Sequence, residues 1–190
     1  QVKSRLIALN VHDAAMRLVE GGCDLLIAYH HPSQPLQLDA ARYDMVVLGE
    51  EVIAPYAKPG PDGNPLFQLP GHVNRPLPYL GYAPGAYLGA VTDWMLKQSQ
   101  TPIHLDRVYE TDMAEGLKAM AMEGHGVAFL PSSAVRKELQ TGQLVSASGQ
   151  SMLPSLSMQV RAYRAHPGSR GLAKRSVQDL WDFLIRQHSK

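Results

Sequence analysis

The stretch that most constrains the fold is GHGVAFLP, residues 124–131. Its two glycines lie on either side of one histidine, and glycine readily takes the left-handed backbone conformation that ends a helix. The four apolar residues that follow are typical of a short strand buried on both faces, in a sheet covered by helices. Pro131 cannot extend the strand ladder, and Ser132 or Ser133 can cap a new helix. The stretch therefore predicts a turn, a buried strand and a helix start, which indicates an α/β architecture.

The residues before this stretch predict an amphipathic helix over 112–123. Met113, Leu117 and Met120 fall at positions i, i+4 and i+7, which share one face of a helix. Asp112 can accept hydrogen bonds from the free amides of the first turn and so cap the helix. We therefore expect both methionines to fill the core beside Leu117.

The same alternation of apolar strands and helices extends along the chain. Residues 58–72, KPGPDGNPLFQLPGH, are rich in proline and glycine and are expected to form a surface loop. Two strand–helix halves joined by two long extended segments predict two Rossmann-like lobes with a ligand cleft between them. Expected strands cover residues 2–9, 24–29, 43–58, 77–82, 103–109, 144–147 and 156–163, and expected helices cover residues 12–20, 86–98 and 170–187.

The composition argues against several classes of protein. The 190 residues carry 18 Lys and Arg against 17 Asp and Glu, with no basic stripe, so we expect no direct contact with nucleic acid. No stretch approaches the ~20 apolar residues of a membrane span. The first ten residues do not resemble a signal peptide. We therefore expect a soluble, cytoplasmic chain with no membrane contact, and its abrupt start indicates a fragment of a longer protein.

Reactive and metal-binding groups are few. The single cysteine, Cys23, excludes an internal disulfide and a cysteine-based zinc site, and it can be either a packed thiol or a redox sensor. His30 and His31 are neighbours at a strand end and should point to opposite sides, so we expect no metal site. No G-x-S-x-G elbow, H-E-x-x-H helix or phosphate-binding loop is present, so we expect neither catalysis nor a cofactor.

Two loops are candidate ligand sites, because each joins the end of a strand to the start of a helix. Asn10, Val11 and His12 form the first loop, whose free backbone amides favour an anion such as a carboxylate. The alternative is that Asn10 or His12 only caps the helix.

The second loop runs from Tyr82 to Tyr87 and contains no serine or threonine. Polar contacts with a ligand would therefore come from backbone amides around Gly85. Tyr82 and Tyr87 could form the walls of a site for an aromatic or apolar effector, or they could lie in the core. Thr111, just before the next helix, could reach the same ligand.

Three segments resemble the effector-binding domain of LysR-type transcriptional regulators: GHGVAFLP, VHDAAMRLVEGGCDLLIAYH and LQTGQLV. The resemblance covers nearly the whole chain and implies a fold similar to type 2 periplasmic binding proteins. Lobe I would comprise residues 1–50 and 160–190, and lobe II residues 51–159. The resemblance also implies that lobe I lacks the family's usual first strand and helix, and that the DNA-binding helix-turn-helix precedes Gln1 and is absent from this chain.

By this resemblance the chain would be the effector-sensing and oligomerising domain of a bacterial regulator. It would bind a small carboxylate or aromatic molecule in the cleft, form a homodimer or homotetramer, and reach DNA only through the missing N-terminal domain. An alternative within the family is sensing of hypochlorite or peroxide through Met113 or Cys23. From other classes, a solute-binding protein of a transporter shares the fold, as does a periplasmic-binding-like enzyme such as a dehydratase.

Overall fold

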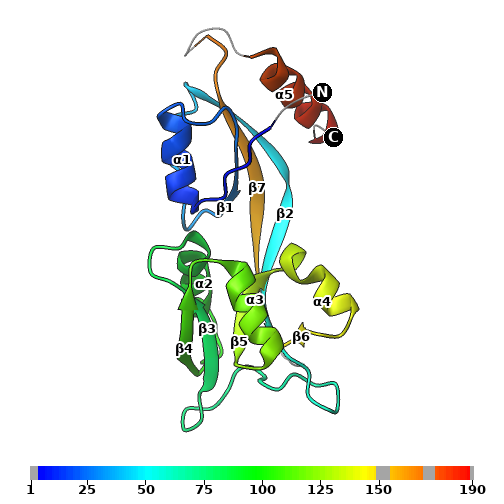
Figure 1. Ribbon diagram of the computed structural model, residues 1–190. Helices are drawn as coiled ribbons and strands as arrows, with labels where there is room; N and C mark the ends of the chain where they lie inside the picture. The colour runs from blue at the N-terminus through cyan, green and yellow to red at the C-terminus, as the bar shows by residue number, and fades with distance from the viewer. Residues whose placement is uncertain (1–3, 149–154, 169–173, 189–190) are drawn as a thin grey trace. The chain divides into compact units, whose positions relative to one another are not determined.

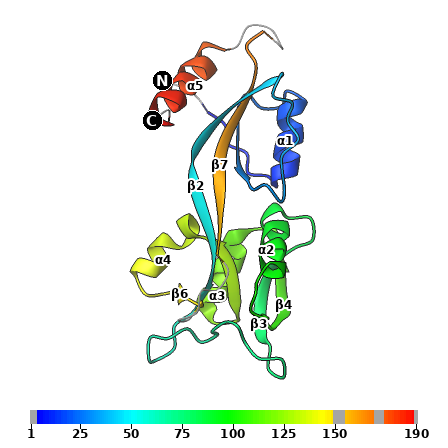
Figure 2. The same cartoon turned by 180° about the vertical axis from the view of Figure 1, so that it is seen from behind.

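The computed structural model describes residues 4–148, 155–168 and 174–188. The chain forms two compact units, which we call unit 1 and unit 2 (Figure 1). Unit 1 comprises Gln1–Glu50 and Met158–Lys190, and unit 2 comprises Glu51–Ser157. Two long neighbouring strands, β2 (Tyr43–Ala57) and β7 (Leu156–Ala165), carry the chain from one unit to the other (Figures 1 and 2).

Unit 1 is built around β1 (Leu26–His30), which pairs antiparallel with β7 so that Leu26 lies opposite Tyr163. Helix α1 (Val11–Val19) packs its apolar face on this pair. The helix has that face because its apolar residues recur at helical spacing. The buried core of unit 1 consists of Ala15, Leu18, Leu26, Ala28, Tyr43 and Tyr163.

Helix α5 (Arg175–His188) is anchored to unit 1 by one aromatic residue. Trp181 is buried, and the guanidinium carbon of Arg164 lies 4.7 Å from the centre of its ring, within the range of a cation–π contact. Arg164 also donates to Asp44 at 2.8 Å and to Gln178 at 2.9 Å. The charge of this buried arginine is therefore compensated inside unit 1.

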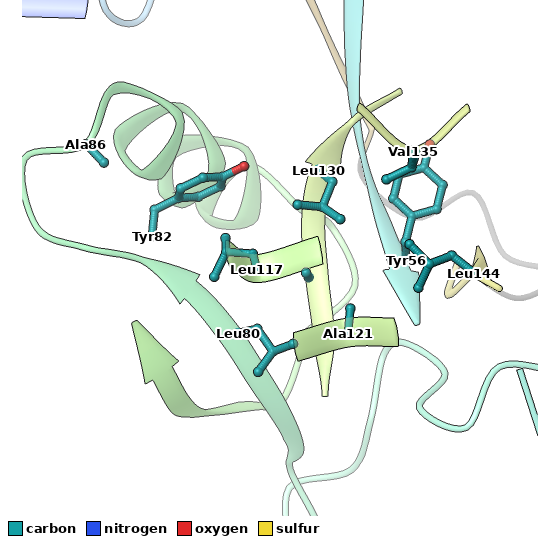
Figure 3. Packing of buried hydrophobic residues seen from close by; sticks show 10 residues of the cluster. Tyr56, Leu80, Tyr82, Ala86, Leu117, Ala121, Leu130, Val135 and Leu144 are labelled. Atoms are coloured by element: carbon teal, nitrogen blue, oxygen red, sulfur yellow. The ribbon is translucent and has the colours of Figure 1, made fainter. Parts of the chain in front are cut away.

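Unit 2 contains β3 (Leu77–Tyr82) between two parallel neighbours, β4 (Leu105–Thr111) and β5 (Val127–Pro131), with β2 antiparallel to β5. Helix α3 (Ala114–Glu123) packs on β3, β4 and β5, and its Leu117 and Ala121 lie in a core with Leu80 and Leu130 (Figure 3). Unit 2 also contains α2 (Tyr87–Lys97), the 3₁₀ helix η1 (Ser132–Val135), α4 (Arg136–Gln140) and β6 (Val145–Ser146).

The GHGVAFLP stretch adopts the predicted turn and strand. Gly124 ends α3 with a φ of 88°, in the left-handed region that favours glycine. A Cβ atom at Gly126 would lie 2.5 Å from the carbonyl oxygen of Pro78, so any side chain there would force β3 and β5 apart. All five residues of β5 are buried, and Pro131 closes the strand opposite Ile53. The α/β architecture is confirmed.

Two local predictions are wrong. Residues 4–9 form no strand, and Leu6 is 96% exposed. A strand needs a neighbour to satisfy its backbone groups, and in the described part of the chain no strand pairs with this segment. The second error concerns Asp112, because the N-cap position of α3 is occupied by Met113. The extended backbone of a cap turns its side chain away from the helical stripe, and Met113 is 59% exposed instead of buried.

Ser132 and Ser133 do not cap a helix either. They begin η1, and no side-chain cap is formed there. Both hydroxyls donate instead to the carboxylate of Glu51 on β2. The apolar pattern predicted the start of the helix correctly, but it could not predict that Glu51, far away in the sequence, accepts these hydrogen bonds.

Candidate functional site

The first predicted loop lies at the start of α1. The carbonyl oxygen of Asn10 accepts the amide of Ala14 at 2.9 Å, and the Asn10 side chain makes no cap hydrogen bond. His12 is exposed, whereas Val11 packs against the unit 1 core. The first-turn amides of a helix lack partners within the helix, but no strand precedes this loop in the described residues, so anion binding here stays a prediction.

The carboxyl end of β1 places a second group of polar side chains in unit 1. His30 lies opposite Gln159 on β7, and Arg161 lies two residues further along the same face. The Nε–H of Arg161 donates to Oε1 of Gln159 at 2.7 Å. Burial, the positive charge of Arg161 and neighbouring His31 together lower the pKa of His30. Sequence reasoning considered His30 only as a metal ligand and missed Arg161 and Gln159.

His31 differs from His30 in having its ring nitrogen satisfied. The backbone amide of Ser33 donates to Nδ1 of His31 at 3.1 Å, and the Ser33 hydroxyl lies 2.7 Å from the same nitrogen. Burial lowers the pKa of His31. A neutral ring whose Nδ1 accepts hydrogen bonds fits both observations.

The second predicted loop lies in unit 2 between β3 and α2. Tyr82 is 2% exposed and packs in the core with Leu117, so the core-tyrosine alternative describes its position (Figure 3). Gly85 is exposed with a φ of 85°, and Tyr87 is half-buried at the start of α2. Thr111 lies opposite Tyr82 at the end of β4. The structure thus brings the four predicted residues to one end of the β3–β4 pair.

Arg107 holds this end of unit 2 together. Its Nη1 donates to the carbonyl oxygen of Tyr82 at 3.0 Å and to Glu110 at 3.2 Å. Its guanidinium carbon also lies 5.4 Å from the ring centre of Tyr79. Gly81 makes this approach possible, because a Cβ atom there would lie 2.9 Å from Nε of Arg107. Arg107 therefore links the ends of β3 and β4.

Glu51, the first residue of unit 2, was missed by sequence reasoning. It is 5% exposed, and its Oε1 accepts the hydroxyl of Ser132 at 2.6 Å and the amide of Ser133 at 3.2 Å. The Ser133 hydroxyl donates to Oε2, and the amide of Val52 donates to Oε1 at 3.0 Å. Burial raises the pKa of Glu51, but these hydrogen bonds outweigh it, and the pKa is lowered overall.

The two predicted redox residues have different surroundings. Cys23 is partly buried against the unit 1 core, as the packed-thiol alternative expects. Met113 is the more exposed of the two. In the described part of the chain, no helix is long and apolar enough to cross a membrane.

Comparison with known proteins identifies the family. The model of the LysR substrate binding domain matches residues 1–189. The truncated regulator QseD of Escherichia coli O157:H7 is 28% identical over 94% of this chain and 69% of its own length. YjiE of Escherichia coli K12, an HTH-type transcriptional regulator, is 27% identical over 94% of this chain and 55% of its own length.

Solved structures support the same assignment. The apo regulatory domain of HypT from Salmonella typhimurium aligns with a TM-score of 0.79 and 25% identity, covering 96% of this chain and 81% of that one. Full-length HypT, a hypochlorite-specific LysR-type regulator, aligns with a TM-score of 0.78 and 26% identity, covering 96% of this chain and 58% of that one. These regulatory domains have the predicted fold, similar to type 2 periplasmic binding proteins. The chain belongs to the LysR substrate-binding domain family.

Proposed function

We propose that this domain senses a small-molecule effector and passes the signal to a DNA-binding helix-turn-helix outside this chain. The observation that carries the proposal is the division into two compact units joined by β2 and β7, each with one of the two candidate loops before a helix, α1 in unit 1 and α2 in unit 2. In this proposal the two units are lobes I and II. Family membership favours a regulator over the solute-binding protein of a transporter, and cytoplasmic action follows from that role.

The effector is proposed to be a carboxylate or an aromatic molecule. The α1 loop of Asn10, Val11 and His12 offers amides to an anion. In unit 2, Gly85 is exposed, and Tyr87 and Thr111 are partly exposed, so they can offer a backbone, an aromatic ring and a hydroxyl to the ligand. An effector that binds one arrangement of the units better than another shifts the population toward that arrangement.

A thermal-shift screen of small carboxylates and aromatic molecules tests the proposal. A true effector at 100 times its dissociation constant stabilises the domain by about 2.7 kcal/mol. The variant His12→Ala should weaken binding of the hit, whereas His125→Ala, an exposed histidine in the turn after α3, should not. A screen in which no compound gives saturable stabilisation would count against the proposal.

Sensing of oxidants is a second candidate function, favoured by the exposure of Met113 and the likeness to hypochlorite-specific HypT. Oxidation to the sulfoxide turns an apolar side chain polar. Under limiting hypochlorite, mass spectrometry should find Met113 oxidised before Met95 and Met158, which are buried and serve as internal controls. Equal oxidation of the three methionines would remove Met113 as a sensor, and Cys23→Ser tests the thiol in the same assay.

The domain is also proposed to self-associate as a homodimer or homotetramer through α1 and α3. Met16 leaves an apolar side chain exposed on α1, a helix whose opposite face is already buried in unit 1. Sedimentation should show a dimer at micromolar concentration and a shift toward monomer in Met16→Glu. The control is Arg42→Glu, on an exposed position of unit 1. A wild-type protein that sediments only as monomer would contradict the proposal.

A further inference from the structure

Arg161 is the starting point, because its charge has no acidic partner among the described residues. Two other arginines whose side chains link different helices or strands each have an acidic partner. Arg164 pairs with Asp44, and Arg107 pairs with Glu110. The hydrogen-bond partner of Arg161 is Gln159, which accepts only from Nε. The two terminal nitrogens, Nη1 and Nη2, together carry four N–H groups, and their edge can bind a carboxylate with two parallel hydrogen bonds.

His30 gives the second, independent observation. Its Nδ1 is shielded from solvent and has no hydrogen-bond partner in the described part of the chain. An imidazole nitrogen buried in this way costs free energy that a hydrogen bond would recover. Rotation of a histidine ring about its Cβ–Cγ bond meets a broad, low barrier, so a modest turn can offer Nδ1 to an incoming oxygen.

The two groups also act on each other. The charge of Arg161 is close enough to disfavour protonation of His30, and the strand register places the two side chains diagonally on one face of β1 and β7. A partly buried cation beside an unpartnered imidazole is unfavourable when the site is empty. A bound anion would compensate both groups, because it pairs with the guanidinium charge and accepts a hydrogen bond from the imidazole ring.

We propose that Arg161 and His30 form the carboxylate anchor of the effector site, with Gln159 as the positioning residue that fixes the plane of the guanidinium. The inference rests on the proposed effector-sensing function and adds a second anion-binding group of unit 1 to the amides of the α1 loop. It lies at the carboxyl end of β1, where His30 is opposite Gln159 of β7. It selects a carboxylate over a neutral amide of the same shape, because only the charged group compensates Arg161.

Acetate is the probe for this anchor, since it is the smallest carboxylate with an alkyl tail. Sodium acetate replaces sodium chloride at constant ionic strength while the Arg161 Nε–H and His30 ring signals are followed by NMR. We expect saturable shifts with a dissociation constant on the order of 10 mM, and no saturable shift with acetamide, the neutral isostere. Arg161→Gln should weaken acetate binding at least tenfold, with Arg42→Gln unchanged as the matched control.

Two further variants separate anchoring from folding. Arg161→Lys keeps the charge without the planar fork and should bind acetate at intermediate strength. Gln159→Ala should weaken binding less than Arg161→Gln and broaden the Arg161 signal. Equal binding of acetate by wild type and Arg161→Gln, both folded by circular dichroism, would overturn the anchor and leave the proposed effector function intact. If acetate bound at Arg161 but no compound in the thermal-shift screen gave saturable stabilisation, the anchor would stand and the proposed effector-sensing function would be contradicted.

Discussion

Glu51 in unit 2 and Arg161 in unit 1 are both charged side chains on the strands that carry the chain between the units, but their surroundings differ. The carboxylate of Glu51 accepts four hydrogen bonds, three of them from Ser132 and Ser133. Arg161 uses one of its donors on Gln159 and has no acidic partner in the described residues. A satisfied buried charge supports the fold, whereas an unsatisfied one is available for a ligand.

The largest expected effect is on the stability of unit 2. Glu51→Ala removes the acceptor of several charge-assisted hydrogen bonds and should cost about 2–4 kcal/mol of unfolding free energy. Arg161→Gln should cost less than about 1 kcal/mol, because it removes one hydrogen bond and an uncompensated charge.

The two tryptophans allow each unit to be followed separately in urea. Trp94 lies in unit 2 and Trp181 in unit 1, so 5-fluorotryptophan labelling gives one ¹⁹F signal for each. The Trp94 signal should shift its urea midpoint strongly in Glu51→Ala. If Arg161→Gln destabilised unit 1 as much as Glu51→Ala destabilises unit 2, the distinction between a structural charge and a ligand-binding charge would fail.

A smaller effect is expected from pH. The pKa of Glu51 is lower in the folded state, so its ionisation contributes stability that is present above the unfolded-state pKa and is lost as the pH falls through the folded-state pKa. The difference in unfolding free energy between wild type and Glu51→Gln should therefore be constant near neutral pH and shrink in acid. Subtraction of the variant removes the contribution of the other carboxylates. A difference that stays constant down to pH 3 would mean that the hydrogen bonds do not lower the pKa of Glu51 in the folded state.

The sequence predicted most of unit 2 because its elements follow local rules. The turn at Gly124, the buried run of residues 127–130 and the strand of residues 77–82 each carry their own signal of conformational freedom or apolar pattern. The segment 4–9 carried the same kind of signal but formed no strand. A strand depends on a partner elsewhere, and periodicity says nothing about whether that partner is present.

The charged groups could not be predicted, because their partners are distant in the chain. Ser132 and Glu51 are 81 residues apart, and Ser132 looked like a helix cap from its position alone. Arg161 and His30 share a face only because β7 returns beside β1. The predicted loop residues were located by a general rule about strand ends, which identifies where a ligand site lies but not which side chains remain unsatisfied.

The smallest effect is the sharpest test of the unpaired charge. Burial is the largest cause that lowers the pKa of His30, with Arg161 second, whereas burial alone lowers the pKa of His31. In Arg161→Gln the pKa of His30 should therefore rise toward the ordinary histidine value and stay below it, while His31 does not change. Histidine titration by NMR in wild type and variant gives both values from one sample, with His31 as the internal control. An unchanged His30 would mean that water or another anion already screens the Arg161 charge, and the contrast with Glu51 would then disappear.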